Sequence, residues 1–103
     1  MTEDELDRFL SDETDINHLL IIFDEADEYN KFKIASRVFE LNKMQGLGLL
    51  ISILQNGELP FVKGEVYNKI VKFSGKDFGY DPMNDATENK KAIDEITAWI
   101  NSL

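Results

Sequence analysis

Cysteine is absent from this chain of 103 residues, and proline occurs only twice. Without cysteine the protein has no disulfide and no thiolate that could bind a metal, which fits a reducing compartment. Long apolar runs are also missing, since the two longest, residues 19–23 and 47–54, are too short to cross a bilayer. The first residues are acidic where a signal peptide would be basic and then apolar. We therefore expect a cytoplasmic protein that does not enter the membrane.

Basic residues are nearly absent from the first third of the chain. Residues 1–30 contain eleven acidic residues and one base, Arg8, whereas residues 31–103 contain nine acids and ten bases. The whole net charge of −9 therefore originates in the first 30 residues. Such a field opposes binding to nucleic acid and acidic membranes, and it attracts basic proteins. The alternative is that these charges only keep the protein in solution.

Apolar residues recur with helical spacing along most of the chain, and no segment shows the convincing alternation of a strand. The sequence predicts helices over residues 2–10, 15–26, 30–42 and 60–73. It also predicts a helix between 42 and 60 that ends near residue 54, and a last helix from about residue 87 to the end. Asp85 or Thr87 is predicted to cap the last of them. The sequence thus predicts an all-α fold of five or six helices, mostly antiparallel neighbours because their turns are short.

Glycine and proline indicate where helices begin and end. We expect Gly46 and Gly48 to bracket the connection between the third and fourth helices. Residues 56–57, Asn-Gly, predict the end of the fourth helix, and Pro60 suits the first position of the fifth. The Gly-, Asp-, Asn- and Pro-rich residues 74–87 predict a loop.

A helix–turn–helix unit occurs twice. His18-Leu19-Leu20-Ile21-Ile22 is similar to Gly48-Leu49-Leu50-Ile51-Ser52, 30 residues later. The amphipathic runs that follow, which start at Phe32 and Phe61, are 29 residues apart. Repeated helical hairpins stack into surfaces that bind other macromolecules without catalytic residues.

The helical spacing also predicts the core. Ile21 and Ile22 widen the apolar stripe of the second helix, so we expect this helix to be covered on more than one side. The residues predicted to face the core are Leu6, Phe9, Leu10, Ile16, Leu19, Leu20, Phe23, Phe32, Ala35, Val38, Phe39, Leu41, Leu47, Leu50, Ile51, Leu54, Val62, Val66, Ile70, Phe73, Ala92, Ile93, Ile96, Trp99, Ile100 and Leu103.

Two features resemble HEAT-type repeats, in which an acidic turn leads to a second helix that opens with a hydrophobic residue and a base. Phe32-Lys33 and Val62-Lys63 resemble that opening pair. Residues 74–82, Ser-Gly-Lys-Asp-Phe-Gly-Tyr-Asp-Pro, are similar to the tail after the last repeat of bacterial HEAT-like proteins. In those proteins a capping helix with a tryptophan follows, as Trp99 does here.

The resemblance covers about residues 15–103 and implies a short right-handed stack of antiparallel helical hairpins. It divides one α-helical domain into a cap helix (1–14), hairpin 1 (15–44), hairpin 2 (45–73), and a turn with a C-terminal capping helix (74–103). Two repeats are fewer than the three that a stable stack usually needs, so residues 2–10 must act as an extra cap. A compact helical bundle is the alternative fold. The resemblance implies macromolecular binding and no particular chemistry.

No constellation of residues indicates catalysis or metal binding. Residues 77–88 carry acids at the spacing of a calcium loop, but Gly79 and Pro82 stand where an oxygen ligand and the turn glycine are needed. His18 is the only histidine, and we expect it to be a partly buried structural residue. The carboxylates cluster in polar turns rather than in a cleft. We therefore expect no enzyme, no cofactor and no metal.

Small size, concentrated negative charge and the lack of recognisable chemistry suggest a non-catalytic inhibitor or immunity-type protein. Its partner would be a basic protein, such as a nuclease toxin. Asp24 to Glu28 support a binding role most strongly, because acids at the end of the second helix oppose its dipole and helix capping does not explain them. The candidate contacts are Asp12, Glu13, Asp15, Asp24, Glu25, Asp27 and Glu28, with Tyr29 as a possible aromatic anchor.

Several alternatives remain open. The protein could be a generic HEAT-like scaffold or adaptor in which the acids serve only solubility. Tyr29 could instead be a turn residue that packs on its own hairpin. Bases on the second helices of the hairpins could hold a phosphate backbone, but we expect them to compensate neighbouring acids; they are Lys31, Lys33, Arg37, Lys63, Lys69 and Lys72. We expect a monomer when the protein is free.

Overall fold

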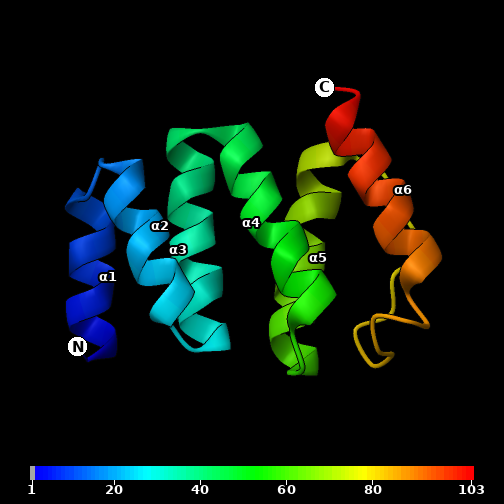
Figure 1. The fold of residues 1–103 in the computed structure, drawn as a ribbon, viewed down its shortest axis with the longest axis horizontal. Helices are drawn as coiled ribbons and strands as arrows, with labels where there is room; N and C mark the ends of the chain where they lie inside the picture. Colours follow the sequence, from blue (N-terminus) through cyan, green and yellow to red (C-terminus); the bar gives the residue numbers. More distant parts are fainter. Residues whose placement is uncertain (1) are drawn as a thin grey trace.

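Six α-helices make up the chain in the computed structural model, which describes residues 2–103 apart from the side chain of Glu3 (Figure 1). They are α1 (Glu3–Asp12), α2 (Ile16–Glu25), α3 (Glu28–Leu41), α4 (Lys43–Asn56), α5 (Pro60–Ser74) and α6 (Lys90–Asn101). No strand occurs in the described residues, and the predicted all-α class is confirmed. Within the same residues, no helix is long and apolar enough to cross a membrane.

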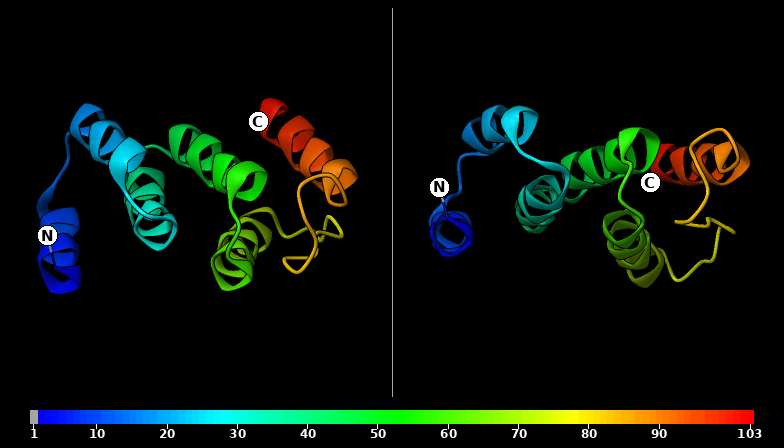
Figure 2. Two further views of the ribbon diagram at one scale, coloured as in Figure 1. Left: turned by 60° about the horizontal axis from the view of Figure 1, so that its bottom comes forward. Right: turned by 90° about the horizontal axis from the view of Figure 1, so that it is seen from below.

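The helices lie in two layers, with successive helices in alternate layers. Figure 2 shows α1, α3 and α5 in one layer and α2, α4 and α6 in the other. The pairs α2–α3 and α4–α5 are antiparallel hairpins, and α6 packs against α4. As a result, the α2–α3 and α4–α5 connections lie at the same edge of the molecule, at the bottom of Figure 1.

The two hairpins bury similar residues, but with a spacing that differs from the one predicted. The burial pattern of α2 returns in α4 after 31 residues, and that of α3 returns in α5 after 32. The corresponding buried pairs are Leu19 and Leu50, Phe23 and Leu54, Ile34 and Val66, and Val38 and Ile70. The predicted offset of 30 is wrong because it aligns the exposed Ile21 with the buried Ile51.

A single residue, Asn42, separates α3 from α4. It ends α3 and caps α4, where its side-chain oxygen accepts a hydrogen bond from the Gln45 N–H at 3.1 Å. The prediction that Gly46 and Gly48 bracket this connection is wrong, since both lie inside α4. The boundary expected at residues 44 and 45 therefore falls inside α4 as well. Gly46 serves close packing instead: a Cβ there would lie 2.2 Å from the Cα of Phe39.

The predicted loop after α5 folds back on that helix. The Tyr67 hydroxyl donates to Asp77 Oδ1 at 2.6 Å and accepts from the Phe78 N–H at 2.7 Å. The hydrogen bond from the Tyr67 hydroxyl lowers the pKa of the Asp77 carboxyl. The Tyr80 ring packs on the Tyr67 ring at 5.1 Å between centroids. The turn is therefore held by its own side chains.

Asn89 closes the loop at the start of α6. Its side chain accepts from the Asp81 N–H at 2.9 Å and donates to the Asp81 and Asn84 carbonyls at 2.7 and 3.2 Å. The buried Lys63 of α5 donates to the same Asn84 carbonyl at 3.0 Å. The N-cap of α6 is Asn89, so the predicted cap by Asp85 or Thr87 is wrong. Asp85 instead accepts from the Glu88 N–H in the turn before the helix.

Some residues predicted in the core are exposed. Leu103 lies beyond the end of α6, and Phe73 is exposed at the last turn of α5. The Phe73 ring still contacts the rings of Phe39 and Trp99, at 5.1 and 5.9 Å between centroids. The stripe of α5 that enters the core therefore ends at Ile70.

The burial of Tyr80 makes the fold sensitive to alkaline pH. Burial raises the pKa of its hydroxyl from 10.0 to about 12, and the charges of Glu28 and Asp81 act in the same direction. Because the folded state holds this proton more tightly, the stabilisation is complete below pH 10 and is lost as the pH rises towards 12. We expect the free energy of unfolding to fall by about 1–2 kcal/mol between these values.

Urea unfolding at both ends of this pH range measures the effect. The variant Tyr80→Phe should lose much of the decline, and the part that remains should come from Tyr67, whose pKa is also raised by burial. An equal decline in the parent and in Tyr80→Phe would contradict this assignment.

Candidate partner-binding surface

The eight predicted contact residues form two groups at opposite ends of α2. Asp12, Glu13 and Asp15 lie around the α1–α2 connection, and residues 24–29 surround the α2–α3 connection (Figure 1). The ten residues of α2 separate the groups by about 15 Å. The structure therefore does not bring the predicted residues together as one cluster.

The first group is mostly engaged in local structure. The Glu13 carboxylate accepts a hydrogen bond from His18 Nδ1 at 2.7 Å. The backbone carbonyl of Glu13 accepts from Arg37 Nε at 3.0 Å. Asp15 caps α2 by accepting from the Asn17 N–H at 3.0 Å. His18 is exposed rather than partly buried, and its ring packs edge-on against Phe9. Asp12 alone in this group is exposed without a side-chain partner among the described residues.

The second group divides at the end of α2. Asp24 and Glu25 occupy its last turn, whereas Asp27 and Glu28 are the N-cap and first residue of α3. The expectation that all four oppose a helix dipole is therefore wrong, since α3 stabilises negative charge at its own beginning. Asp24 and Glu25 remain exposed in an unfavourable position, with no ion pair among the described residues. Neither acid forms a side-chain hydrogen bond or an ion pair that would stabilise the fold within the described residues.

Glu28 joins the two hairpins at this edge. Its two carboxylate oxygens accept from the Glu58 N–H at 2.6 Å and from the Leu59 N–H at 2.8 Å, just before α5. A Cβ at Gly57 would lie 3.2 Å from this carboxylate, so the glycine leaves room for it. Glu28 thus satisfies two donors that precede the first turn of α5, so its carboxylate has a structural role in addition to its charge.

Replacing Glu28 with alanine should lower the free energy of unfolding by about 1–2 kcal/mol, because two backbone donors lose a charged acceptor. The matched control is Glu25→Ala, which removes an exposed acid of the same type without a hydrogen bond among the described residues. It should leave stability unchanged or raise it slightly. Chemical denaturation compares them, and equal stability of the two variants would refute the role given to Glu28.

Exposed apolar side chains lie beside these acids. Tyr29 at the start of α3 and Phe61 at the start of α5 pack together with ring centroids 6.0 Å apart. Phe61 is 62% exposed and Leu59 is also exposed, although the predicted repeat placed Phe61 on an amphipathic stripe. The reason is that α5 buries Val62 and Val66, which turns Phe61 outward. Tyr29 packs on the next hairpin rather than on its own and remains exposed, and its role as an aromatic anchor stays a prediction.

The outer face of α2 adds a further apolar side chain. Ile21 is 65% exposed, so the expectation that it widens a buried stripe is wrong. It lies one turn before Asp24 and Glu25, on the same side of the helix. The apolar character of Ile21 and Phe61 predicts positions on amphipathic stripes, and the sequence makes no prediction for Leu59.

We define the turn edge as these neighbouring residues of the two connections: Asp24, Glu25, Asp27, Glu28, Tyr29, Glu58, Leu59 and Phe61. None of its five carboxylates forms an ion pair with a base in the described residues. Among the ion pairs of the described residues, the bases of α3 contribute Lys33 with Asp7 at 2.9 Å and Arg37 with Glu40 at 3.1 Å. The turn edge therefore keeps its negative charge beside exposed aromatic rings.

The described residues contain no group of three or more His, Cys, Asp or Glu side chains that could hold a metal ion. Comparisons with family models, with curated proteins and with solved structures find no match for this chain. The turn edge thus combines aromatic contact area, carboxylates without an ion pair in the described residues, and backbone groups that Glu28 satisfies.

Proposed function

We propose that the protein is a non-catalytic binding module that recognises a basic protein through the turn edge, as an inhibitor or immunity-type protein does. The observation that carries this proposal is the pairing of Tyr29 and Phe61, both exposed, beside acids that have no ion pair in the described residues. Aromatic anchors contribute much of the energy of protein interfaces, and unpaired surface charge accelerates the encounter.

The contact with Lys33 illustrates what the aromatic pair can bind. The Lys33 ammonium lies 5.0 Å from the centroid of the Tyr29 ring, so this ring already accepts a cation on its face. The Phe61 ring is more exposed than the Tyr29 ring. Arginine or lysine side chains of a partner would therefore find aromatic faces and carboxylates within the same small area. A nuclease toxin, whose active site must be basic to bind phosphates, has this chemistry.

A generic HEAT-like scaffold or adaptor is the second candidate. The alternation of the helices between two layers favours it, because stacked hairpins present broad faces to partners. In an adaptor the partner would lie on the layer of α3 and α5, and reversal of the acids at the turn edge would have little effect on binding.

The experiment compares two double charge reversals that change the net charge equally. Asp24→Lys/Glu25→Lys alters the turn edge, and Asp12→Lys/Glu95→Lys alters exposed acids at the end of α1 and on α6. Asp12 is a predicted contact, but it lies at the opposite end of α2 from the turn edge and is not part of this proposal. Each immobilised protein is exposed to the basic proteins of its source cells, and the affinity for any captured protein is measured. We expect the first variant to bind at least about tenfold more weakly and the second to bind like the parent.

The activity of the captured protein then separates the two candidates. Blocked nuclease activity in the presence of the parent supports an inhibitor, and unchanged activity with intact binding supports an adaptor. An equal loss in both double variants would mean that only net charge matters, and an equal affinity in all three proteins would exclude the turn edge.

A further inference from the structure

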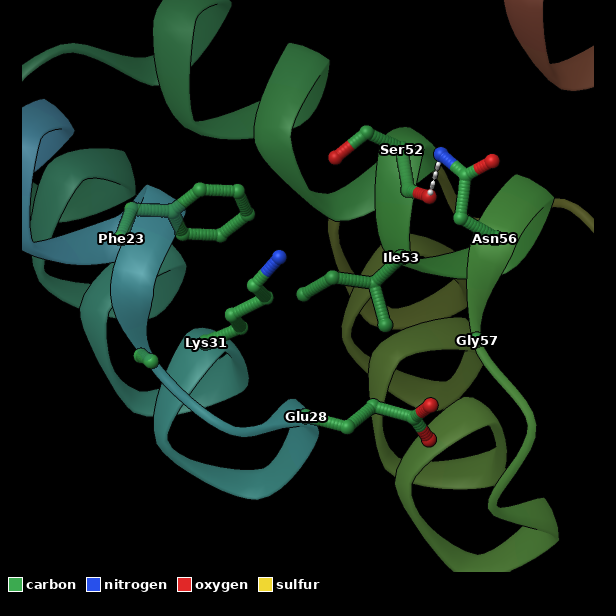
Figure 3. A pocket seen from close by; sticks show the side chains of 8 residues that line it. Phe23, Glu28, Lys31, Ser52, Ile53, Asn56 and Gly57 are labelled. Atoms are coloured by element: carbon green, nitrogen blue, oxygen red, sulfur yellow. Dashed lines mark hydrogen bonds between the residues drawn. The ribbon is translucent and has the colours of Figure 1, made fainter.

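A cavity of about 180 Å³ lies between the two hairpins, close to the turn edge but on the α2 and α4 side (Figure 3). Phe23 and Ile53, both buried, form its apolar walls. Lys31 enters from α3, and Ser52 and Asn56 lie along α4. Residues of both hairpins thus enclose a small space with an apolar and a polar side.

The Lys31 ammonium is the cation of this cavity. Its recorded contact is the Phe23 ring, 5.2 Å from the nitrogen to the centroid, and no acceptor within the described residues hydrogen-bonds it. Figure 3 shows the amine directed into the cavity, whereas the Glu28 carboxylate points away from it towards Gly57. The Glu28 carboxylate accepts two backbone N–H groups instead, and Lys31 forms no ion pair among the described residues.

The neighbouring polar groups leave specific capacity for a ligand. The Ser52 hydroxyl donates to the Leu49 carbonyl at 2.7 Å, so its oxygen keeps lone pairs for a further donor. Asn56 donates one amide hydrogen to the Ser52 carbonyl at 3.1 Å, which leaves its second N–H for another acceptor. Lys31 and Asn56 therefore both line the cavity with donor capacity that the described residues do not use.

We infer that this cavity binds a carboxylate on a short apolar chain, held by Lys31 and Asn56 with its carbons against Phe23 and Ile53. With about 30 Å³ for each water-sized group, the volume admits about six non-hydrogen atoms. That is the size of butyrate, or of a glutamate side chain presented by a protein. The single ammonium and the adjacent Glu28 charge disfavour a phosphate dianion. This inference does not rest on the proposed function.

The test is an NMR titration of the full chain with butyrate, with N-acetylglutamate N-methylamide as a model of a protein side chain, with butyramide as the neutral analogue, and with inorganic phosphate. We expect butyrate to shift resonances of Phe23, Lys31, Ser52 and Ile53, and butyramide to bind at least tenfold more weakly. Binding of the glutamate model as well identifies a side-chain ligand, whereas binding of butyrate alone identifies a free acid.

Two variants supply the control. Lys31→Met keeps the apolar stem over Phe23 but removes the charge, and it should weaken butyrate binding at least tenfold. Lys91→Met, at an exposed lysine of α6, should bind like the parent. Equal binding of butyramide, tighter binding of phosphate, or unchanged affinity in Lys31→Met would overturn the inference. The comparison of butyrate with butyramide uses the parent alone and holds even if a variant fails to fold.

Discussion

Replacing Gly46 with alanine will destabilise the protein by about 2–4 kcal/mol, although alanine favours helices more than glycine does. The new methyl group would lie 2.2 Å from the Cα of Phe39 and 2.5 Å from its nitrogen, which are backbone atoms that no rotamer change can move. The α3 and α4 helices must therefore separate along the seam of the two hairpins. For a domain whose total stability is about 5–15 kcal/mol, this is a large fraction.

The neighbouring Gly48 provides the matched control within the same helix. A Cβ at Gly48 would meet no atom within 4 Å, so Gly48→Ala should stabilise the protein by about 0.5–1 kcal/mol through helix propensity alone. Urea unfolding of both variants measures effects of opposite sign. A Gly46→Ala protein as stable as the parent would show that α3 and α4 do not approach as closely as described.

Replacing Asn89 with alanine will lower the free energy of unfolding by about 3 kcal/mol. Asn89 is 3% exposed, and its side chain satisfies the Asp81 N–H and two carbonyls that lie inside the loop. Alanine leaves the Asp81 N–H without its acceptor, while the Asp81 carbonyl keeps only the Asn84 N–H and the Asn84 carbonyl keeps only Lys63. We expect residues 76–89 to loosen first, and hydrogen exchange at the Asp81 amide to accelerate with the loss of stability.

Asn68 of α5 is the control for this change, since it is exposed and makes no side-chain hydrogen bond within the described residues. Asn68→Ala should change stability by less than about 0.5 kcal/mol. If thermal or urea denaturation shows the same small effect for both asparagines, the loop is held by its aromatic packing and not by Asn89.

The helices and most of the core could be predicted because they follow from local patterns. Pro60 begins α5 and the Asn-Gly pair ends α4, as the sequence indicates. The predicted first helix is also present, and Thr2 caps it by accepting from the Glu5 N–H at 3.2 Å. Failures occurred where the tertiary structure decides. Glycine is typical of turns, and only the close contact of Gly46 with Phe39 of α3 shows why a glycine is needed inside α4.

The candidate surface could be predicted only in part, for the same reason. Tyr29 and the acids near it are visible in the sequence as a cluster, but their division between the two helix ends depends on one residue, Ala26, as the cap of α2. The Glu28 side chain accepts hydrogen bonds from backbone groups that lie 30 and 31 positions further along the chain, and no local pattern reveals such contacts. Phe61 reaches the same edge because hairpins in register place their connections side by side.

The most direct measurement of partner recognition at the turn edge is the association rate constant of the captured basic partner as a function of ionic strength. For Asp24→Lys/Glu25→Lys we predict association at least about tenfold slower than for the parent at low salt, with the difference shrinking as salt screens the charges. Association as fast as that of the parent at low salt would contradict recognition through these acids.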